Sequence, residues 1–234
     1  MERSVKSLVI IPAYNEEKSI DRTVEDIRRN APDFDFVVVN DCSSDQTLGI
    51  CLEKGYPVLN LPVNLGIGGA VQTGYRYARQ NGYEVAVQFD GDGQHDAAYL
   101  DAMRDKLLTQ KLDMVIGSRF LEKEGFQSSG IRRLGIRYFT RLIRILTGTV
   151  ITDPTSGMRM AGKTVIAEFA DNYPKDYPEP ESVVRILRQG CKVQEYPVKM
   201  RRRTEGTSSI SPGRSIYYMV KVTLAIFMEM LRRQ

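Results

Sequence analysis

Short apolar runs alternate with longer polar segments through the first half of the chain. Four runs rich in β-branched residues span residues 8–11, 36–39, 85–89 and 114–116. Such runs are typical of strands buried on both faces of a parallel sheet. The intervening charged segments, residues 17–30, 45–54, 69–81 and 97–110, are long enough for crossover helices. The pattern therefore predicts a doubly wound α/β domain.

Polar clusters follow each of the four predicted strands. They are Pro12–Glu16, Asn40–Asp45, Asp90–His95 and Gly117–Arg119. Open α/β sheets bind their ligands outside the carboxyl ends of the strands. We therefore expect these four clusters to line one crevice.

The second half of the chain is more basic. Residues 131–148 contain five arginines and no acidic residue, and four of these arginines share one helical face: Arg133, Arg137, Arg141 and Arg144. An adjacent stripe is apolar: Leu134, Tyr138, Leu142 and Ile145. A basic amphipathic helix of this kind suits an anionic membrane surface. The alternative is an ordinary solvated face on a helix packed against the core.

The end of the chain, residues 216–233, is strongly apolar and closes on an arginine pair. Lys221 and Glu229 interrupt it, so it is predicted to lie at a membrane interface, or to dock a small membrane-protein partner, without spanning the bilayer. The three cysteines show neither metal-ligand spacing nor a disulfide framework. We expect a cytoplasmic protein held peripherally at the inner face of the cell membrane, with no nucleic acid as partner and with a homo-oligomer left open.

Asp90-Gly91-Asp92 carries the clearest candidate chemistry. Two carboxylates leave one tight turn after an apolar run, and Gly91 allows a close backbone approach. Paired carboxylates suit Mg²⁺ or Mn²⁺ bridged to a diphosphate. Acidic turns are common, so this triplet alone is a weak signal.

Three further polar segments are ambiguous when taken singly. Asp41 follows a strand directly and would accept hydrogen bonds from a nucleobase or ribose, whereas Asp45 suits a helix N-cap. Glu16 would also favour a helix N-terminus. The glycines of residues 64–70 lack the spacing of a dinucleotide-binding loop, and we expect a flexible loop that opens the helix from Ala70.

Taken in order, the motifs resemble those of glycosyltransferase family 2. They are Pro12-Ala13-Tyr14-Asn15-Glu16, the Asn40–Asp45 cluster, Asn64-x-Gly66-x-x-x-Ala70 and Asp90-Gly91-Asp92-x-Gln94-His95. Gly117-Ser118-Arg119 and the block Asp153–Arg159 are similar to the branch of that family that acts on polyprenyl phosphates. The resemblance covers about residues 5–210, and Asn40 departs from it, since the family usually has Asp there.

The resemblance implies a GT-A fold, Rossmann-like, with a mostly parallel sheet flanked by helices. It would form a domain of residues 1–210, followed by a C-terminal apolar and basic helix over residues 211–234. The nucleotide sugar would be bound by Pro12, Tyr14, Glu16, Asp41, Asn64, Gly66, Asp90 and Gln94. Asp90 and Asp92 would hold the metal, and Asp153 would lie near the transferred sugar.

The expected function is inverting transfer of a hexose or N-acetylhexosamine from a UDP-sugar to a polyprenyl phosphate such as undecaprenyl phosphate, in the service of the cell wall. The acceptor phosphate is already anionic, so no strong base is needed. Arg119, with Arg132 or Arg133, would hold that phosphate. Arg202 belongs to a basic loop, residues 201–203, that would close over diphosphate or lipid phosphate.

Two alternatives remain open. If the acceptor is a sugar hydroxyl of a cell-wall or surface polysaccharide, one of Asp176, Glu179 and Glu181 would have to remove its proton. The chain would otherwise be a non-catalytic scaffold that binds nucleotide sugars within a membrane complex. Intact Asp90, Asp92 and Asp153 count against the scaffold, which has no need of metal-binding carboxylates.

Overall fold

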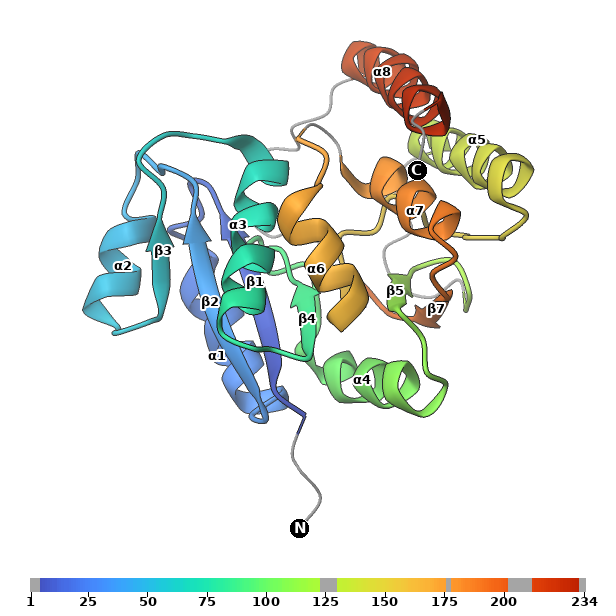
Figure 1. The fold of residues 1–234 in the computed structure, drawn as a ribbon. Helices are drawn as coiled ribbons and strands as arrows, with labels where there is room; N and C mark the ends of the chain where they lie inside the picture. Colours follow the sequence, from blue (N-terminus) through green and yellow to red (C-terminus); the bar gives the residue numbers. More distant parts are fainter. Residues whose placement is uncertain (1–4, 123–129, 176–177, 202–211, 232–234) are drawn as a thin grey trace.

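A seven-stranded sheet lies at the centre of the described structure (Figure 1). The computed structural model describes residues 5–122, 130–175, 178–201 and 212–231, and side chains for these ranges apart from residues 130–132 and 212–216. The sheet order is β3-β2-β1-β4-β6-β5-β7, and only β6 runs antiparallel to its neighbours. The strands are β1 (Ser7–Ala13), β2 (Phe34–Asn40), β3 (Val58–Asn60), β4 (Val85–Gln88), β5 (Met114–Ser118), β6 (Arg159–Gly162) and β7 (Val193–Pro197).

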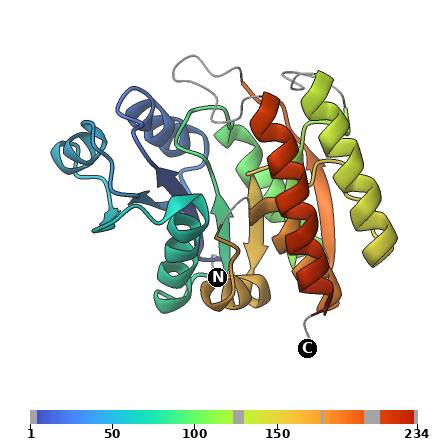
Figure 2. The same ribbon diagram turned by 90° about the horizontal axis from the view of Figure 1, so that it is seen from above.

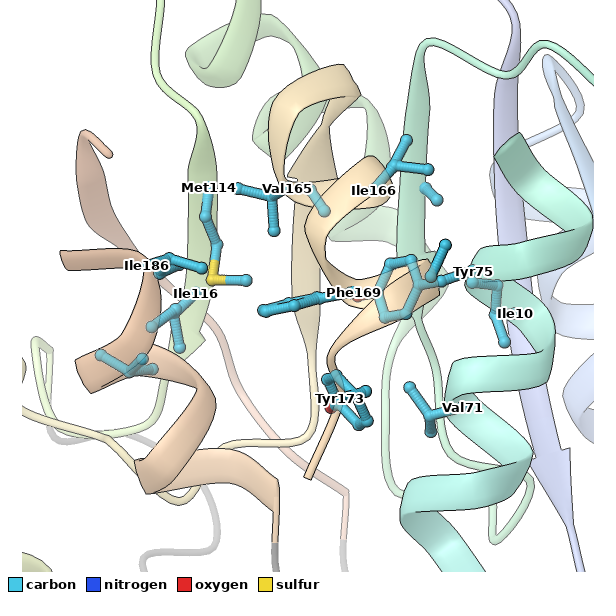
Figure 3. Close-up of a cluster of buried hydrophobic side chains, with 14 of the residues drawn as sticks. Ile10, Val71, Tyr75, Met114, Ile116, Val165, Ile166, Phe169, Tyr173 and Ile186 are labelled. Atoms are coloured by element: carbon cyan, nitrogen blue, oxygen red, sulfur yellow. The ribbon is translucent and has the colours of Figure 1, made fainter. Parts of the chain in front are cut away.

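Helices cover both faces of the sheet. One layer holds α1 (Ile20–Asn30), α2 (Thr47–Glu53), the short 3-10 helix η1 (Ala97–Tyr99) and α4 (Leu100–Thr109). The other holds α3 (Gly66–Gln80), α5 (Gly130–Thr147), α6 (Lys163–Asp171), α7 (Pro178–Arg188) and α8 (Pro212–Leu231). Each layer encloses its own apolar cluster, and Figure 3 shows part of the second, where Ile10 of β1, Tyr75 of α3 and Phe169 of α6 meet.

The predicted strands and crossover helices are confirmed with small shifts of boundary. The exception is the glycine segment of residues 66–69, where we expected a flexible loop and where the first turn of α3 forms instead. A Cβ on Gly68 would lie 2.1 Å from the carbonyl oxygen of Pro174, and one on Gly74 would lie 2.1 Å from a methyl carbon of Ile10. These glycines therefore let α3 approach the chain before α7 and the sheet closely, which is a packing role that spacing alone does not reveal.

Helices α5 and α8 run side by side at the edge of the fold (Figure 2). Phe139 and Tyr218 join them, with ring centroids 5.7 Å apart. α8 is also fixed to α7, because Arg185 donates to the buried Glu229 over 2.6 Å. Within the part of the chain that the structure describes, no helix is both long enough and apolar enough to cross a membrane.

Candidate active site

The site lies where the strand order reverses, between β1 and β4. The loops that follow these two adjacent strands lead to α1 and to η1 and α4, which lie in the same helix layer. Open α/β sheets bind their ligands outside the carboxyl ends of the strands, where these two loops meet. Gly91 fits tightly against the first loop, since a Cβ on it would lie 3.1 Å from the carbonyl oxygen of Pro12 and 3.6 Å from Cγ of Glu16. Thr23 of α1 donates to the Gly91 carbonyl over 3.1 Å. The Asp90–Asp92 turn is thereby held against the β1–α1 loop.

Three groups hold Asp90 in place. Gln88 Nε2 donates to Asp90 Oδ1 over 3.1 Å, and the Asp90 backbone N–H donates to His95 Nδ1 over 3.0 Å. Gly157, in the loop before β6, approaches so closely that a Cβ there would lie 2.6 Å from Asp90 Oδ2. His95, the only histidine of the chain, is 2% exposed and supports the turn by this bond.

Asp92 and Gln94 continue the same turn. Asp92 Oδ1 accepts the Gln94 backbone N–H over 3.0 Å, and the Gln94 carbonyl accepts the N–H of Arg201 over 2.8 Å. The Arg201 guanidinium forms ion pairs with Asp26 and Asp96. Arg201, the first residue of the predicted basic loop, thus ties the turn to α1. Arg202 lies outside the described residues.

The loops after β1 and β2 are joined to one another. Asn15 receives a hydrogen bond from the backbone of Ser44 and donates its own N–H to Ser43, over 2.8 and 3.0 Å. Asp45 accepts from the backbones of Glu17 and Thr47, over 3.0 and 2.9 Å, and so binds the first residue of α2. The N-cap position itself is occupied by Gln46 and not, as the sequence predicts, by Asp45. Three of the predicted nucleotide-binding residues, Tyr14, Glu16 and Asp41, lie on these joined loops, and Tyr14 is 51% exposed at their surface.

Asp41 is buried at the end of β2 and organises the start of α3. Its Oδ1 accepts the N–H of Leu65 over 2.7 Å, and its carbonyl accepts from Asn64 Nδ2 over 3.1 Å. Asn64 Oδ1 in turn accepts the N–H of Gly66 over 3.1 Å. Asp41, Asn64 and Gly66, which the sequence predicts to bind the donor, are therefore brought together in one hydrogen-bonded cluster.

Arg119 and Asp153 form a buried ion pair at the end of β5. Arg119 Nε and Nη2 donate to the two carboxylate oxygens, each over 2.7 Å. Burial alone would lower the pKa of the guanidinium, but hydrogen bonds and attraction to Asp153, with a contribution from Asp90, hold that pKa above its ordinary value. Arg119 and Asp153, two predicted site residues that lie 34 positions apart in the sequence, are thus in direct contact. Asp90 is close enough to affect the pKa of Arg119.

Glu195 of β7 supports this pair, and sequence reasoning missed it. Its carboxylate accepts the backbone N–H groups of Thr152 and Asp153 over 2.8 and 2.7 Å, and the Thr152 hydroxyl over 3.0 Å. Burial raises the pKa of Glu195, although these three bonds oppose the rise. β7 also contains Gln194 and Tyr196, so nothing in the sequence of this strand singles out Glu195.

Arg159 ties the Asp153–Arg159 loop to α7, and its role also went unpredicted. It is fully buried and donates to the carbonyls of Pro154, Ser156 and Glu179 and to the Ser182 hydroxyl. Its bonds fix the first turn of α7 beside the loop that contacts Asp90. A fully buried cation here runs against the usual exposure of arginine, which is why the sequence does not reveal it.

Of the candidate bases, Glu179 and Glu181 lie in the first turn of α7, and Asp176 lies outside the described residues. Burial raises the pKa of Glu179; Arg159 opposes this rise and Asp90 adds to it. Arg133 lies exposed on α5, while the side chain of Arg132 lies outside the described part. Glu179 therefore has an electrostatic link to Asp90.

The donor set at Asp90 and Asp92 fits a hard divalent cation. Two carboxylates emerge from one turn, and Gln88 together with Gly157 holds the first of them. The described residues contain no group of three or more His, Cys, Asp or Glu side chains that would hold a metal without help. Mg²⁺ usually takes one or two carboxylates and completes its shell with water and substrate phosphates. The site therefore fits a metal that is bound together with a diphosphate.

Comparison with known proteins gives a consistent family. The model described as Glycosyl transferase family 2 matches residues 8–169. The undecaprenyl-phosphate mannosyltransferase of Micrococcus luteus is 31% identical over 89% of this chain and 89% of its own length. The UDP-N-acetylglucosamine–dolichyl-phosphate N-acetylglucosaminyltransferase of Methanococcus voltae is 27% identical over 82% of this chain and 84% of its own.

Among solved structures, glucosyl-3-phosphoglycerate synthase of Mycobacterium tuberculosis, in complex with Mn²⁺, UDP-glucose and phosphoglyceric acid, superposes with a TM-score of 0.76. The match covers 96% of this chain and 79% of that one at 16% identity. The same synthase has also been solved with Mg²⁺ and UDP. At this identity the likeness concerns the fold, and it agrees with the predicted GT-A architecture.

Proposed function

This chain is a member of glycosyl transferase family 2, and we propose that it transfers a hexose or N-acetylhexosamine from a UDP-sugar to a polyprenyl phosphate. Membership makes it a glycosyltransferase enzyme, so the non-catalytic scaffold is set aside. The observation that best supports this proposal is the position of Asp90, at the point between β1 and β4 where the strand order reverses. Gln88 and Gly157 hold the Asp90 carboxylate there. The acceptor class draws support from relatives whose names specify undecaprenyl and dolichyl phosphates.

The donor would lie across the joined loops after β1 and β2. Tyr14 offers an exposed ring to the base, and Asp41 offers a buried carboxylate already oriented by Leu65. Asp90 and Asp92 would hold a Mg²⁺ or Mn²⁺ ion whose charge, when bound, stabilises the leaving diphosphate. Gln94 follows in the same turn and would line the diphosphate side of the site.

The transfer would be a single displacement with inversion at the anomeric carbon. The acceptor phosphate carries negative charge near pH 7, so it attacks without prior loss of a proton. Arg119 uses Nε and Nη2 for Asp153, which leaves Nη1 of the same guanidinium to meet an acceptor oxygen. Asp153, which the resemblance places near the transferred sugar, would thus also orient Arg119.

An exposed basic and apolar surface supports a lipid acceptor. The core-facing side of α5 is Ile136, Phe139 and Ile143. Of the predicted apolar stripe, Leu134, Tyr138 and Ile145 are exposed, whereas Leu142 is partly buried and packs against the core. On α8 the exposed apolar residues are Tyr217, Val220, Leu224, Phe227, Met228 and Leu231. The two helices pack side by side, and the exposed arginines of α5 are Arg133, Arg137, Arg141 and Arg144. The proposed working place is the inner face of the cell membrane, where such a surface meets anionic lipid.

A sugar hydroxyl is the second candidate acceptor, and Glu179 is the observation that favours it. Burial raises the pKa of Glu179; the positive charge of Arg159 opposes this rise, and the negative charge of Asp90 adds to it. A carboxylate with a raised pKa is a better base for a hydroxyl proton than an ordinary one. We prefer the polyprenyl phosphate as acceptor, because the names of the relatives specify lipid phosphates.

The test is a donor and acceptor screen. Purified protein is incubated with UDP-glucose, UDP-N-acetylglucosamine or GDP-mannose, and with vesicles containing undecaprenyl phosphate or with soluble oligosaccharides. We expect a sugar-linked lipid from one UDP-sugar, and none after chelation of divalent metal. Product on the oligosaccharide alone would instead support a hydroxyl acceptor. Product from GDP-mannose would show that the donor carries guanine and not uracil.

A further inference from the structure

We infer that Gln88 is a positioning residue that aims the Asp90 carboxylate, and that Tyr173 holds Gln88 in the orientation this requires. The inference rests on the proposed role of Asp90 as a metal ligand. It concerns two side chains that no sequence motif contains, 85 positions apart along the chain.

The strand geometry brings Gln88 and Asp90 together. Side chains two positions apart project to the same side of a strand. Val85 and Val87 belong to the apolar cluster beside α1 and α4, while Ala86 belongs to the cluster beside α3 and α6. Gln88 therefore projects into the second cluster, where it is 1% exposed, and its Nε2 reaches Asp90 Oδ1 over 3.1 Å.

The chemistry of the carboxylate fixes the direction of the whole chain of bonds. An ionised carboxylate only accepts hydrogen bonds, so the Gln88 amide must turn its NH₂ group towards Asp90. Its Oε1 then faces Tyr173, whose hydroxyl donates to it over 3.3 Å. Burial raises the pKa of Tyr173 well above its ordinary value, so this phenol keeps its proton throughout the physiological range.

The aromatic cluster fixes the phenol itself. Tyr173 packs edge to face on Phe169, with ring centroids 4.9 Å apart, and its ring lies 5.7 Å from that of Tyr75. Figure 3 shows the three rings meeting between α3 and α6. The core thus holds Tyr173, Tyr173 orients Gln88, and Gln88 sets the direction of a carboxylate that is itself partly exposed.

A metal ligand held in this way binds more tightly, because groups behind a ligand orient it and their loss typically costs 10- to 100-fold in metal affinity. We therefore measure Mn²⁺ binding by electron paramagnetic resonance in the presence of UDP, a readout that needs no acceptor and no turnover. Gln88→Met, which keeps the volume and loses both bonds, should weaken Mn²⁺ binding about 10-fold or more. Tyr173→Phe, which keeps the ring, should weaken it about fivefold.

The proposed roles of Gln88 and Tyr173 also predict that the effects of their substitutions on Mn²⁺ affinity are not additive. Tyr173 acts through Gln88, so Tyr173→Phe should add nothing to Gln88→Met in the double variant. Tyr83→Phe is the matched control, because it removes a buried phenol that donates to Asp35 over 2.9 Å elsewhere in the fold. It should leave Mn²⁺ affinity unchanged at a similar loss of thermal stability.

The outcomes separate this inference from the proposed function. If the wild type fails to bind Mn²⁺ with UDP, the metal role of Asp90 and the inference fall together. If the wild type binds and Gln88→Met stays within twofold of it, the inference alone is overturned. Additive losses in the double variant, or a loss in Tyr83→Phe equal to that in Tyr173→Phe, would overturn the part played by Tyr173. Tyr173→Phe keeps the test open should Gln88→Met fold poorly.

Discussion

Arg119 clasps Asp153 with two parallel hydrogen bonds of 2.7 Å, and Asp153 is completely buried. The backbone under Asp153 is held in turn by Glu195. Breaking a buried pair by removing one partner leaves an uncompensated charge. Removal of either partner alone should therefore destabilise the fold as well as disturb the proposed acceptor site.

Asp153→Ala should lower the free energy of unfolding by about 3–5 kcal/mol, the range for a buried ion pair that loses one partner. Urea unfolding of purified variants measures it. The double variant Arg119→Met/Asp153→Leu should recover most of that loss while remaining inactive. Asp171→Ala, which removes the exposed partner of Arg79, is the control and should change stability little. Equal losses at Asp153 and Asp171 would refute the buried-pair account.

Asp92→Asn and Asp90→Asn should each reduce sugar transfer to the background rate with the fold unchanged, because an amide is a much poorer ligand for Mg²⁺ or Mn²⁺ than a carboxylate. Chelation with EDTA should stop the wild type, and added Mn²⁺ should restore it. Product formation is measured beside circular dichroism. Asp101→Asn is the matched control, because Asp101 is a half-exposed carboxylate of α4 that pairs with Arg104. Wild-type turnover in either site variant would contradict the metal assignment.

The architecture was largely predictable from the sequence, and the reason is visible in β1, β2 and β4. Their residues face apolar layers on both sides, so unbroken β-branched runs mark them. β6 escaped prediction because it has four residues, two of them Arg159 and Gly162, and pairs in the antiparallel sense. Such a strand is stabilised by partners that lie far away in sequence.

Some residues of the candidate site could likewise be predicted from the sequence, and others could not. Asp90, Asp92 and Asp41 follow strands directly, so position in the chain was enough to suggest them. Gln88 and Glu195 act on groups 2 and 42 residues away through side-chain geometry, and no local pattern distinguishes them from ordinary strand residues. The glycines of α3 misled prediction because close packing and flexibility use the same residue type.

Glu179→Gln should gain stability relative to the wild type as pH rises. The Glu179 pKa is raised in the folded protein, so its contribution to stability is present below the ordinary value of 4.5 and is lost as pH rises through the folded pKa. A glutamine has no such loss. The difference in unfolding free energy, variant minus wild type, should therefore increase from pH 4.5 towards neutrality. Glu53→Gln, exposed on α2, is the control, and a flat difference for Glu179→Gln would contradict the burial of an ionising group.

Glu179→Gln and Glu181→Gln should both retain most of their activity on a lipid-phosphate acceptor, since no proton is removed there. Initial rates with vesicle-bound acceptor measure this. A loss of two to four decades in one variant, about the contribution of a general base, would instead indicate a hydroxyl acceptor.

Charge reversal of Arg137, Arg141 and Arg144 to Glu should weaken binding to anionic vesicles. Each cation contributes about 1 kcal/mol near an anionic surface, and the attraction is screened by salt. Flotation with vesicles at two salt concentrations measures it. Reversal of Arg28, Arg29 and Lys54, exposed in the opposite helix layer, is the control. If both triple variants float equally well, α5 presents only a solvated face.

Helix α7 has a different neighbour at each end. Its first turn gives the Glu179 carbonyl and Ser182 to Arg159, while its later residues Arg185 and Arg188 grip Glu229 of α8. α7 thus connects the proposed lipid-facing helix α8 with the loop in which Gly157 contacts Asp90. If α8 docks on a bilayer as proposed, these contacts would hold the loop beside Asp90 at one height above the lipid phosphates.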